Sequence, residues 1–565
     1  MKKITMIALA MFTAVGAGAQ TIYDATNIAQ KELNGTARFV GMGGAMGALG
    51  GDISTIGTNP AGIGIYRSND AMLTFGYSMT GTESNYVGNK FETNKNRWSF
   101  DNAGFVIASK IGNHTPLRYV NFGFNYHKSK SFYKNMTMQG VMGSIDNQYV
   151  SQVRSMAQQA TDAAYAFYHR PQYDYPDQGA YLDYGRKDIY QHNYAGWLGT
   201  MGYQGALVLE DIESEDYNTY LPYIPSEADA YFLSRERGGI DQYDFNISFN
   251  INDRFYFGVT LGAYDVDYNK YSLYNEMYAY KWEGDGQIYE EGYSLESFNR
   301  IHGSGFDFKF GAIFRPIEDS PLRIGLAVHT PTYYKLTYTT GALLTSDLFL
   351  PNEAGDETLT RTTVDTYSAL GGRDMDRDFK LQTPWVFNAS LGYTVGNNLA
   401  LGAEYEYEDY SSMKFKYPEG DEMAWETGEA DLCMKGVSTL RLGAEYKPIP
   451  AFSLRAGYNY STAAYKKDAI KALPSNSINT DTDFANSKSM NTFTLGIGYR
   501  FSSFYADLAY KFDTYKSDFY PFYNDINARA TSTTRSCSGR SRRAAPMKRT
   551  RSRATWTPKS SRSLS

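Results

Sequence analysis

The stretch Phe306–Phe314, FDFKFGAIF, alternates phenylalanine with residues that are charged or small. Successive side chains of a β-strand point to opposite faces, so the phenylalanines would share one face, and Asp307 and Lys309 the other. A lysine between two phenylalanines does not suit a strand that is buried on both faces. The pattern predicts instead a strand with one face toward lipid and the other toward water, as in a transmembrane β-barrel.

The same period of two recurs along the chain. We expect thirteen strands, at residues 68–80, 101–111, 117–130, 239–252, 254–278, 292–315, 321–340, 381–395, 398–414, 436–447, 451–465, 488–502 and 503–519. Short turns follow the even-numbered strands, and long polar loops follow the odd-numbered ones, which is typical of an outer-membrane barrel. We therefore predict an all-β fold, a transmembrane antiparallel β-barrel of about 14 strands over residues 67–520. Thirteen strands leave the final one unmade.

The N-terminus, MKKITMIALAMFTAVGAGAQ, has the pattern of a secretory signal peptide. Two lysines precede an apolar run, and Ala17-Gly18-Ala19 offers a cleavage site, so we expect residues 1–19 to be removed. No apolar run of about 18 residues follows, so no transmembrane helix is expected. A closed sheet also spans lipid, because its backbone groups bond to one another. These features predict the cell outer membrane of a Gram-negative bacterium.

A glycine-dense stretch, GMGGAMGALGG, begins at Gly41. It does not fit the phosphate-binding pattern G-x-G-x-x-G, because Met46 stands where the third glycine belongs. It is also too apolar for a flexible linker. A barrel of this size would leak unless something occupied its lumen. We therefore predict that residues 20–66 form an N-terminal plug, or hatch, whose glycines allow close approach to the inner wall. Asn59-Pro60 would set a rigid turn toward the first strand.

The N-terminal motif resembles that of the FadL/TodX family of outer-membrane transporters for hydrophobic compounds. The matching residues are Ala37, Gly41, Met42, Gly43, Gly44, Ala45, Asp52, Asn59, Pro60, Ala61 and Gly62. Two stretches built around Thr-Pro, HTPTYYKLTYT (His329–Thr339) and LQTPWVFNASLGY (Leu381–Tyr393), resemble strand motifs of the same family. The resemblance covers residues 20 to about 520.

The resemblance implies a fourteen-stranded barrel, a plug at the N-terminus and passive uptake of fatty acids or aromatic hydrocarbons. The plug residues would be Gly41, Gly43, Gly44, Asp52, Asn59, Pro60 and Ala61. It also implies lateral exit through a gap beside the third strand, for which Gly123 and His127 are the candidate positions. The implied partners are the lipid bilayer and lipopolysaccharide, a hydrophobic small molecule and the outer-membrane assembly machinery; nucleic acid is not expected.

The longest predicted loop, residues 131–238, contains a helical pattern. Its apolar residues recur at steps of three and four and include Val153, Met156, Ala160 and Phe167. The stripe would either pack over the mouth of the barrel as a lid or line an external groove that captures the substrate.

The sequence offers no catalytic motif, cofactor motif or metal motif. The six histidines, at positions 114, 127, 169, 192, 302 and 329, do not have the spacing of zinc ligands. No G-x-S-x-G elbow occurs, so we expect no enzyme. The alternative to transport is a surface receptor or adhesin that binds haem, a glycan or another ligand through its aromatic loops.

The tail, residues 528–565, differs in composition from the rest of the chain. It carries nine Arg, two Lys and no acidic residue. The whole chain has a net charge of −6, so the residues before the tail have a net charge of −17. We favour a reading-frame error as its origin, with a disordered extension as the alternative. Translation of the downstream DNA in the other frames would then give an alternating strand that ends in Phe or Tyr.

Overall fold

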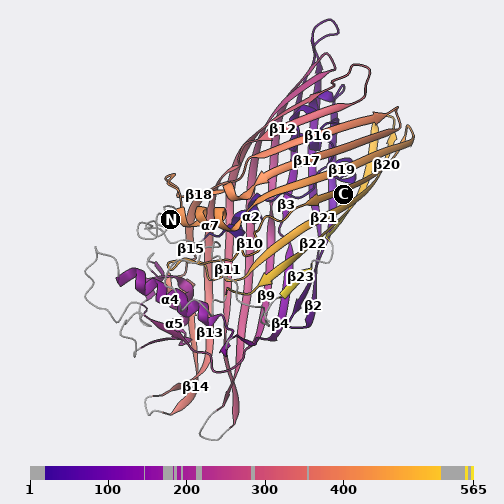
Figure 1. The fold of residues 1–565 in the computed structure, drawn as a ribbon. Helices are drawn as coiled ribbons and strands as arrows, with labels where there is room; N and C mark the ends of the chain where they lie inside the picture. The colour runs from indigo at the N-terminus through magenta and orange to yellow at the C-terminus, as the bar shows by residue number, and fades with distance from the viewer. Residues whose placement is uncertain are drawn as a thin grey trace, which may run out of the picture.

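The computed structural model describes residues 20–145, 147–168, 182, 187–191, 195–211, 219–281, 287–352, 356–523, 554–557 and 561–564. The predicted signal peptide lies outside these residues. The main element is an antiparallel sheet that curves into a barrel (Figure 1). Within the described ranges, none of the helices has both the length and the apolar character needed to cross a membrane.

The barrel wall follows the order of the chain, and successive wall positions pair antiparallel; β12 and β13 together form one position, and β15 and β16 form the next. The wall strands are β1 (Asp70–Tyr86), β2 (Asn89–Lys110), β3 (Leu117–Ser131), β9 (Asp229–Ile251), β10 (Phe255–Lys281), β11 (Ile288–Phe314), β12 (Arg323–His329), β13 (Tyr333–Pro351), β15 (Met375–Gln382), β16 (Val386–Val395), β17 (Leu399–Asp409), β19 (Gly436–Ile449), β20 (Phe452–Ser461), β21 (Phe484–Phe501) and β22 (Phe504–Tyr520). Each predicted strand coincides with part of this wall, which confirms the predicted fold class.

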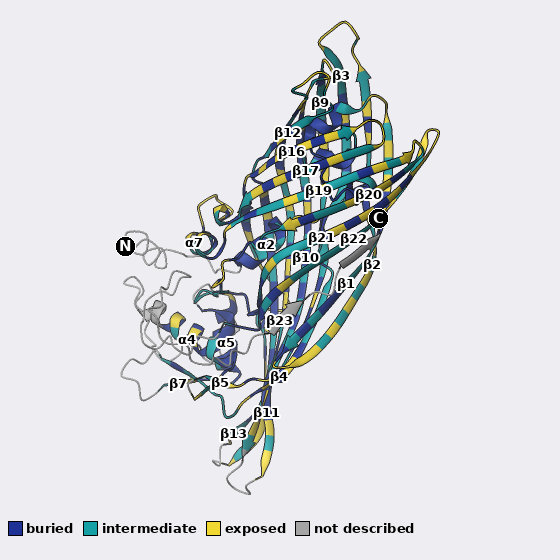
Figure 2. Ribbon diagram, turned by 45° about the vertical axis from the view of Figure 1, so that its right-hand side comes forward, coloured by how far each residue is buried: buried dark blue, intermediate teal, exposed yellow. Residues whose placement is uncertain are grey.

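Exposed and buried residues alternate along the wall strands (Figure 2). On β11, Phe306, Phe308 and Phe310 are 48%, 41% and 50% exposed, whereas Asp307 and Lys309 between them are fully buried at 0%. The apolar residues therefore face outward and the charged residues face the lumen. This is the arrangement that lipid outside the wall requires, and the reverse of a soluble protein with a dry core.

Two wall positions are each made of two strands. Thr330–Thr332 separates β12 from β13, and the segment 383–385 separates β15 from β16. Both interruptions contain a proline, which cannot donate a ladder hydrogen bond. They lie side by side, and Thr332 N–H donates to Thr383 Oγ1 at 2.8 Å. The threonines thus restore contact where the prolines interrupt the ladder.

The outer ends of several strands differ from the prediction. Residues 81–100 were expected in a long loop, but they extend β1 and β2, which are joined by the turn Val87-Gly88. Both turn residues have positive φ, 48° and 87°, as two-residue hairpin turns require. Long hairpins twist together, so β1 and β2 extend the barrel outward where a loop was expected. β10 and β11 reach 27 residues each, close to the predicted spans 254–278 and 292–315.

The shorter elements gather at the end of the barrel where β14 (Glu357–Asp365) projects (Figure 1). The helices are α4 (Val153–Tyr168), α5 (Trp197–Gln204), α6 (Thr366–Ala369) and α7 (Ala424–Cys433), with η3 (Lys187–Gln191) and η4 (Tyr410–Ser412). The short strands are β4 (Lys134–Val141), β5 (Ser144–Ile145), β6 (Gln148–Tyr149), β7 (Val208–Glu210), β8 (Tyr220–Pro222) and β18 (Lys414–Lys416). Their buried side chains form one apolar cluster with the inner face of the outer barrel.

Eight residues of the tail take strand positions in the barrel wall. β23 (Ala554–Thr557) and β24 (Ser561–Leu564) pair antiparallel with β22 on one side and β1 on the other. The backbone of the tail thus lies between the first and last wall strands. The other residues of the tail lie outside the described residues, and its origin by a frame error stays a prediction.

Candidate functional site: the N-terminal segment and a break in the wall

Residues 20–66, the N-terminal segment, lie against the inner face of the wall. The segment contains α2 (Ile22–Ala29), α3 (Ala37–Gly41), η1 (Ile53–Gly57) and η2 (Pro60–Ile65). Side-chain caps start all four: Thr21 caps α2, Thr36 caps α3, Asp52 caps η1 and Asn59 caps η2. Its contacts run around the wall, from β2 and β3 near η1 to β21 and β22 near α3.

The glycines of the segment lie where its backbone meets the wall. A Cβ on Gly41 would lie 3.2 Å from the Cα of Gly496, and a Cβ on Gly43 would lie 3.2 Å from the Cα of Gly457. Gly43 and Gly44 also have positive φ, 62° and 74°, which favours glycine. The stretch is therefore neither a phosphate-binding loop nor a linker. Its backbone packs directly against the backbone of the wall.

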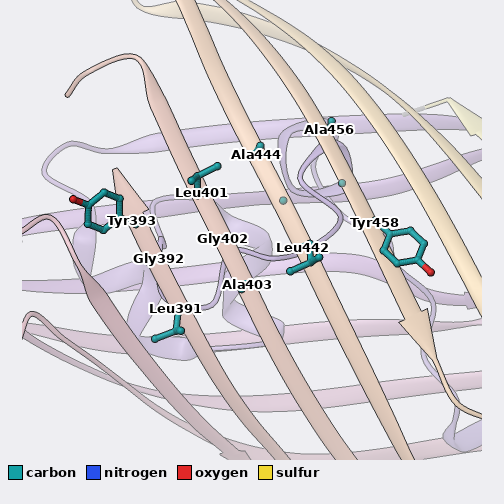
Figure 3. A pocket seen from close by; sticks show the side chains of 12 residues that line it. Leu391, Gly392, Tyr393, Leu401, Gly402, Ala403, Leu442, Ala444, Ala456 and Tyr458 are labelled. Carbon is teal, nitrogen blue, oxygen red and sulfur yellow. The ribbon is translucent and has the colours of Figure 1, made fainter. Parts of the chain in front are cut away.

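The wall contributes glycines to the same contact. Gly392, Gly402, Gly443 and Gly457 are paired in one row across β16, β17, β19 and β20. A Cβ on Gly443 would overlap the carbonyl oxygen of Met42. On the lipid side of this row is an apolar groove of about 580 Å³, lined by leucine, tyrosine and alanine side chains (Figure 3). The wall is thin at this level because its residues are small.

Polar contacts fix the turns of the segment. Thr36 donates to Asp52 Oδ1 at 2.8 Å, and burial raises the pKa of the Asp52 carboxyl. Asn59 Nδ2 donates to the carbonyl of Gly47 at 2.8 Å, and Ala61 N–H donates to Asn59 Oδ1 at 3.2 Å. The carbonyl of Pro60 accepts a hydrogen bond from Ser248 Oγ at 2.8 Å. These residues of the predicted hatch motif therefore hold the fold of the segment and its position on the wall.

Buried ion pairs join the segment to the last strands. Arg38 Nε lies 2.9 Å from Glu445 Oε2, which also lies 2.7 Å from Arg455 Nε. Arg455 continues to Asp507 of β22 at 2.5 Å. In the same layer, Gly47 N–H donates to Glu404 Oε2 at 3.1 Å. The charged inner face thus binds the segment through its backbone as well as its side chains. No group of acidic, histidine or cysteine side chains in the described ranges could hold a metal ion.

The ladder between β2 and β3 stops partway. The last pair is Asn102 with His127, although β3 stays paired with β9 as far as Ser131. We call the unpaired edge, Lys128–Ser131 of β3, the wall break. In the described residues, no strand pairs with this edge on the β2 side. A bulge between Lys128 and Lys130 shifts the register here, and such bulges interrupt pairing.

The N-terminal segment supplies the missing partners of the wall break. Glu32 N–H donates to the carbonyl of Ser129 at 3.0 Å, and Asn34 Nδ2 donates to the carbonyl of Lys128 at 3.0 Å. Ser131 N–H donates to Glu32 Oε2 at 3.4 Å. Burial raises the pKa of the Glu32 carboxyl. We call these three hydrogen bonds the latch.

Beyond the wall break, side chains of β2 contact β4 and the residue that precedes it. Thr93 Oγ1 donates to the carbonyl of Asn135 at 2.8 Å. The guanidinium of Arg97 lies 3.9 Å from the ring centre of Tyr133. The break is therefore a bounded interruption with polar and cation–π contacts on its outer side, and not an open seam along the whole barrel.

The predicted positions of the wall gap lie next to this break. Gly123 is paired on both sides, with Val106 and Asn246, so it does not weaken the ladder. His127 occupies the last paired position and lies 3.7 Å from Asp244. Glu32 and Asn34 were not among the predicted site residues. Nothing in their local sequence marks them, because their role depends on a strand that lies about a hundred residues away.

The residues of the predicted capture helix are buried. Val153 and Met156 of α4 are 0% exposed and Ala160 is 1% exposed. α4 packs on α5, whose Gly199 lies close to the backbone of Ala160. The side chain of Phe167 lies outside the described residues. Of the two predicted roles of this stripe, the open external groove is not formed, because Gly199 lets α5 pack closely on α4; the role of a lid stays a prediction.

An apolar outer face, a polar lumen and an antiparallel wall define this protein as an outer-membrane β-barrel. Residues 240–509 match the family model of the outer membrane protein transport proteins (OMPP1/FadL/TodX). This match agrees with the resemblance that the N-terminal motif and the Thr-Pro stretches indicated. The family consists of transport proteins for hydrophobic compounds, and not of enzymes.

Two solved structures resemble the chain at low sequence identity. A FadL homologue from Pseudomonas aeruginosa is 13% identical, over 94% of this chain and 98% of that chain, with a TM-score of 0.42. The toluene transporter TodX of Pseudomonas putida is 11% identical, over 94% of this chain and 98% of that chain, with a TM-score of 0.44. Curated protein sequences give no match.

Proposed function

We propose that this protein is a channel for the passive uptake of hydrophobic small molecules, such as fatty acids or aromatic hydrocarbons. The N-terminal segment is its plug, and the wall break is the exit through which the solute enters the bilayer. The observation that carries the proposal is the latch. At the break, carbonyls of β3 bond to the plug and not to β2, so a local movement of the plug would free the edge.

The side chains near the break suit an apolar solute. On the inner side beyond the break, Phe132, Met136, Met138 and Phe232 are buried. Before the break, the inner face of β3 is polar, with Asn121 and Asn125 fully buried against the plug side. A solute that descends from the outer lumen would therefore meet apolar side chains as far as the break and a polar, tightly packed layer below it.

The energetics allow such a gate without an energy source. Each latch hydrogen bond contributes about 0.5–1.5 kcal/mol net, so opening all three costs only a few kcal/mol. Segments held this weakly open locally on microsecond to millisecond timescales. Transfer of the solute from water to hydrocarbon is favourable by about 25 cal/mol per Å² of apolar surface, which drives the exit into the bilayer.

The test is uptake of a fluorescent fatty acid by liposomes that contain the full-length protein. The double variant Glu32→Ala/Asn34→Ala should take up the probe faster than the wild type, because the latch is gone. The control is Thr21→Ala, in the same segment, which removes the cap of α2 and should leave the rate unchanged. An unchanged rate in the latch variant would contradict the proposal.

The same assay separates transport from the alternative function. A surface receptor would bind its ligand in detergent, yet its uptake rate in liposomes would equal that of protein-free liposomes.

A further inference from the structure

We propose that the outer surface of β9, β10 and β11 is a binding site for the phosphorylated saccharide of lipopolysaccharide. A groove of about 570 Å³ lies on this surface. Its side chains lie in two rungs: Arg235, Tyr271 and Phe298 in one, and Arg237 and Asn269 in the other, which Arg300 continues at the edge of the groove. The inference rests on the membrane orientation of the barrel, and not on the proposed uptake function.

The groove faces away from the lumen. The residues that alternate with it, Ser234, Glu236, Ser272 and Ser297, are buried on the inner side. Arg235 and Arg300 are exposed, and Phe298 is 38% exposed. These side chains therefore meet whatever surrounds the barrel at this height.

The height of the groove follows from the register of β9. Tyr126 and Tyr243 form an outward aromatic pair with ring centres 5.4 Å apart, and such tyrosines mark the boundary of the membrane. Arg237 lies six residues farther out on β9. At about 3.3 Å per residue and a tilt of about 40°, this places Arg237 about 15 Å beyond the boundary. In the outer leaflet, the saccharide of lipopolysaccharide occupies this layer.

The charges of the groove suit a phosphate. Other exposed arginines of the barrel have acidic partners: Arg300, at the edge of the groove, pairs with Asp267, and Arg361, away from it, pairs with Asp347. Neither Arg235 nor Arg237 has an ion-pair partner among the residues that the structure describes. Two guanidinium groups without carboxylates, on a chain whose barrel portion is strongly acidic, form a site for an anion.

The other groups of the groove suit a sugar. Tyr271 and Phe298 offer ring faces, on which the apolar face of a sugar ring packs. Asn269 offers an amide to a hydroxyl group. Two carboxylates flank the rungs: Glu296 accepts from the hydroxyl of Tyr271 at 2.8 Å, and Asp267 accepts from Arg300. Both acids are already hydrogen-bonded within the protein. Arg237 donates through Nη1 to the carbonyls of Lys134 and Glu236, which holds its guanidinium at the groove while no carboxylate in the described residues balances its charge.

The experiment uses the full-length protein in detergent and purified rough-type lipopolysaccharide that keeps its phosphates. Binding is measured by native mass spectrometry and by the shift in thermal stability. The variant Arg235→Glu/Arg237→Glu should lose affinity by about tenfold or more, because two charge-assisted contacts are replaced by repulsion. Arg361→Glu, an equal change at an exposed site away from the groove, should bind as the wild type does.

Two further arms keep the test specific. Folding of every variant is checked by its heat-modifiable mobility on SDS gels, which does not depend on the ligand. The wild type should bind dephosphorylated lipopolysaccharide and phosphatidylglycerol much more weakly than the intact molecule. Equal binding of either one would overturn the inference, and so would wild-type affinity in a folded Arg235→Glu/Arg237→Glu variant.

Discussion

Lys309 provides the sharpest test of the charged lumen. Its Nζ lies 2.9 Å from Asp244 Oδ1 and 2.9 Å from Asp307 Oδ1. The exposed fractions of the three side chains are 0%, 0% and 1%. Lys309→Met keeps the length of the side chain and removes its charge, so it leaves two buried carboxylates without their shared cation. We expect a marked loss of stability.

The size of the loss follows from the remaining contacts. Breaking a buried ion pair by removing one partner costs about 3–5 kcal/mol. Asp307 keeps a hydrogen bond from the hydroxyl of Tyr264 at 2.7 Å, and Asp244 keeps one from the amide of Gln242 at 2.9 Å. These contacts still stabilise the carboxylates, so we expect the lower limit, about 3 kcal/mol.

The assay is urea-induced unfolding in lipid vesicles, followed by tryptophan fluorescence. Lys335→Met, the same substitution at an exposed position on the neighbouring β13, should change the free energy of unfolding by less than about 0.5 kcal/mol. Adding Asp244→Asn and Asp307→Asn to Lys309→Met should restore most of the lost stability, because no uncompensated charge remains. The reasoning is refuted if Lys309→Met unfolds with the wild type, or if the triple variant is less stable than the single one.

Three other predictions concern helix α7, the barrel wall and the N-terminal segment. Burial raises the pKa of Glu426 on α7 to about 7, so its ionisation disfavours the folded state and stability falls as the pH rises from about 4.5 to about 7. Glu426→Gln should therefore be more stable than the wild type above pH 7, by up to about 3 kcal/mol, and equal to it near pH 4, as thermal melts would show. Gly443→Leu should displace the N-terminal segment, because even its Cβ would overlap the carbonyl of Met42; ion conductance across planar bilayers should rise, whereas Ala456→Leu on the lipid side should leave it unchanged. Asn59→Ala removes the cap of η2 and the bond to Gly47, so it should cost about 1–2 kcal/mol in urea unfolding. Asn59→Asp should cost at least as much, because it would place a buried carboxylate oxygen against the carbonyl of Gly47.

The wall could be predicted from the sequence because its physical cause is local. Each strand must turn one face to lipid, so the alternation in FDFKFGAIF is repeated wherever the chain crosses the membrane. Outside the membrane this requirement ends. Residues 81–100 alternate weakly, and only pairing across the hairpin makes them strands. The outer extensions of β1 and β2 were therefore missed.

The site was harder to predict because its contacts join distant parts of the chain. The glycines of the N-terminal segment could be recognised, since glycine at this density signals close backbone contact. Their partners, such as Gly457, look like ordinary strand glycines until the register is known. The wall break depends on a bulge near Ser129 and on a lost pairing to β2, neither of which leaves a mark in the sequence. Likewise, α4 has an amphipathic pattern, but only the position of α5 shows which surface its stripe covers.

The position of the N-terminal segment has a consequence for biogenesis. Leu33 accepts a hydrogen bond from Lys511, 478 residues later, and Arg38 pairs with Glu445. The first residues to leave the export channel therefore find their final contacts only when the last strands have been made. Contacts of such long range form slowly, so the N-terminal segment reaches its final position only after the barrel has closed around it. If the segment plugs the lumen, as we propose, we expect the newly inserted barrel to conduct ions until the segment has bound to the wall.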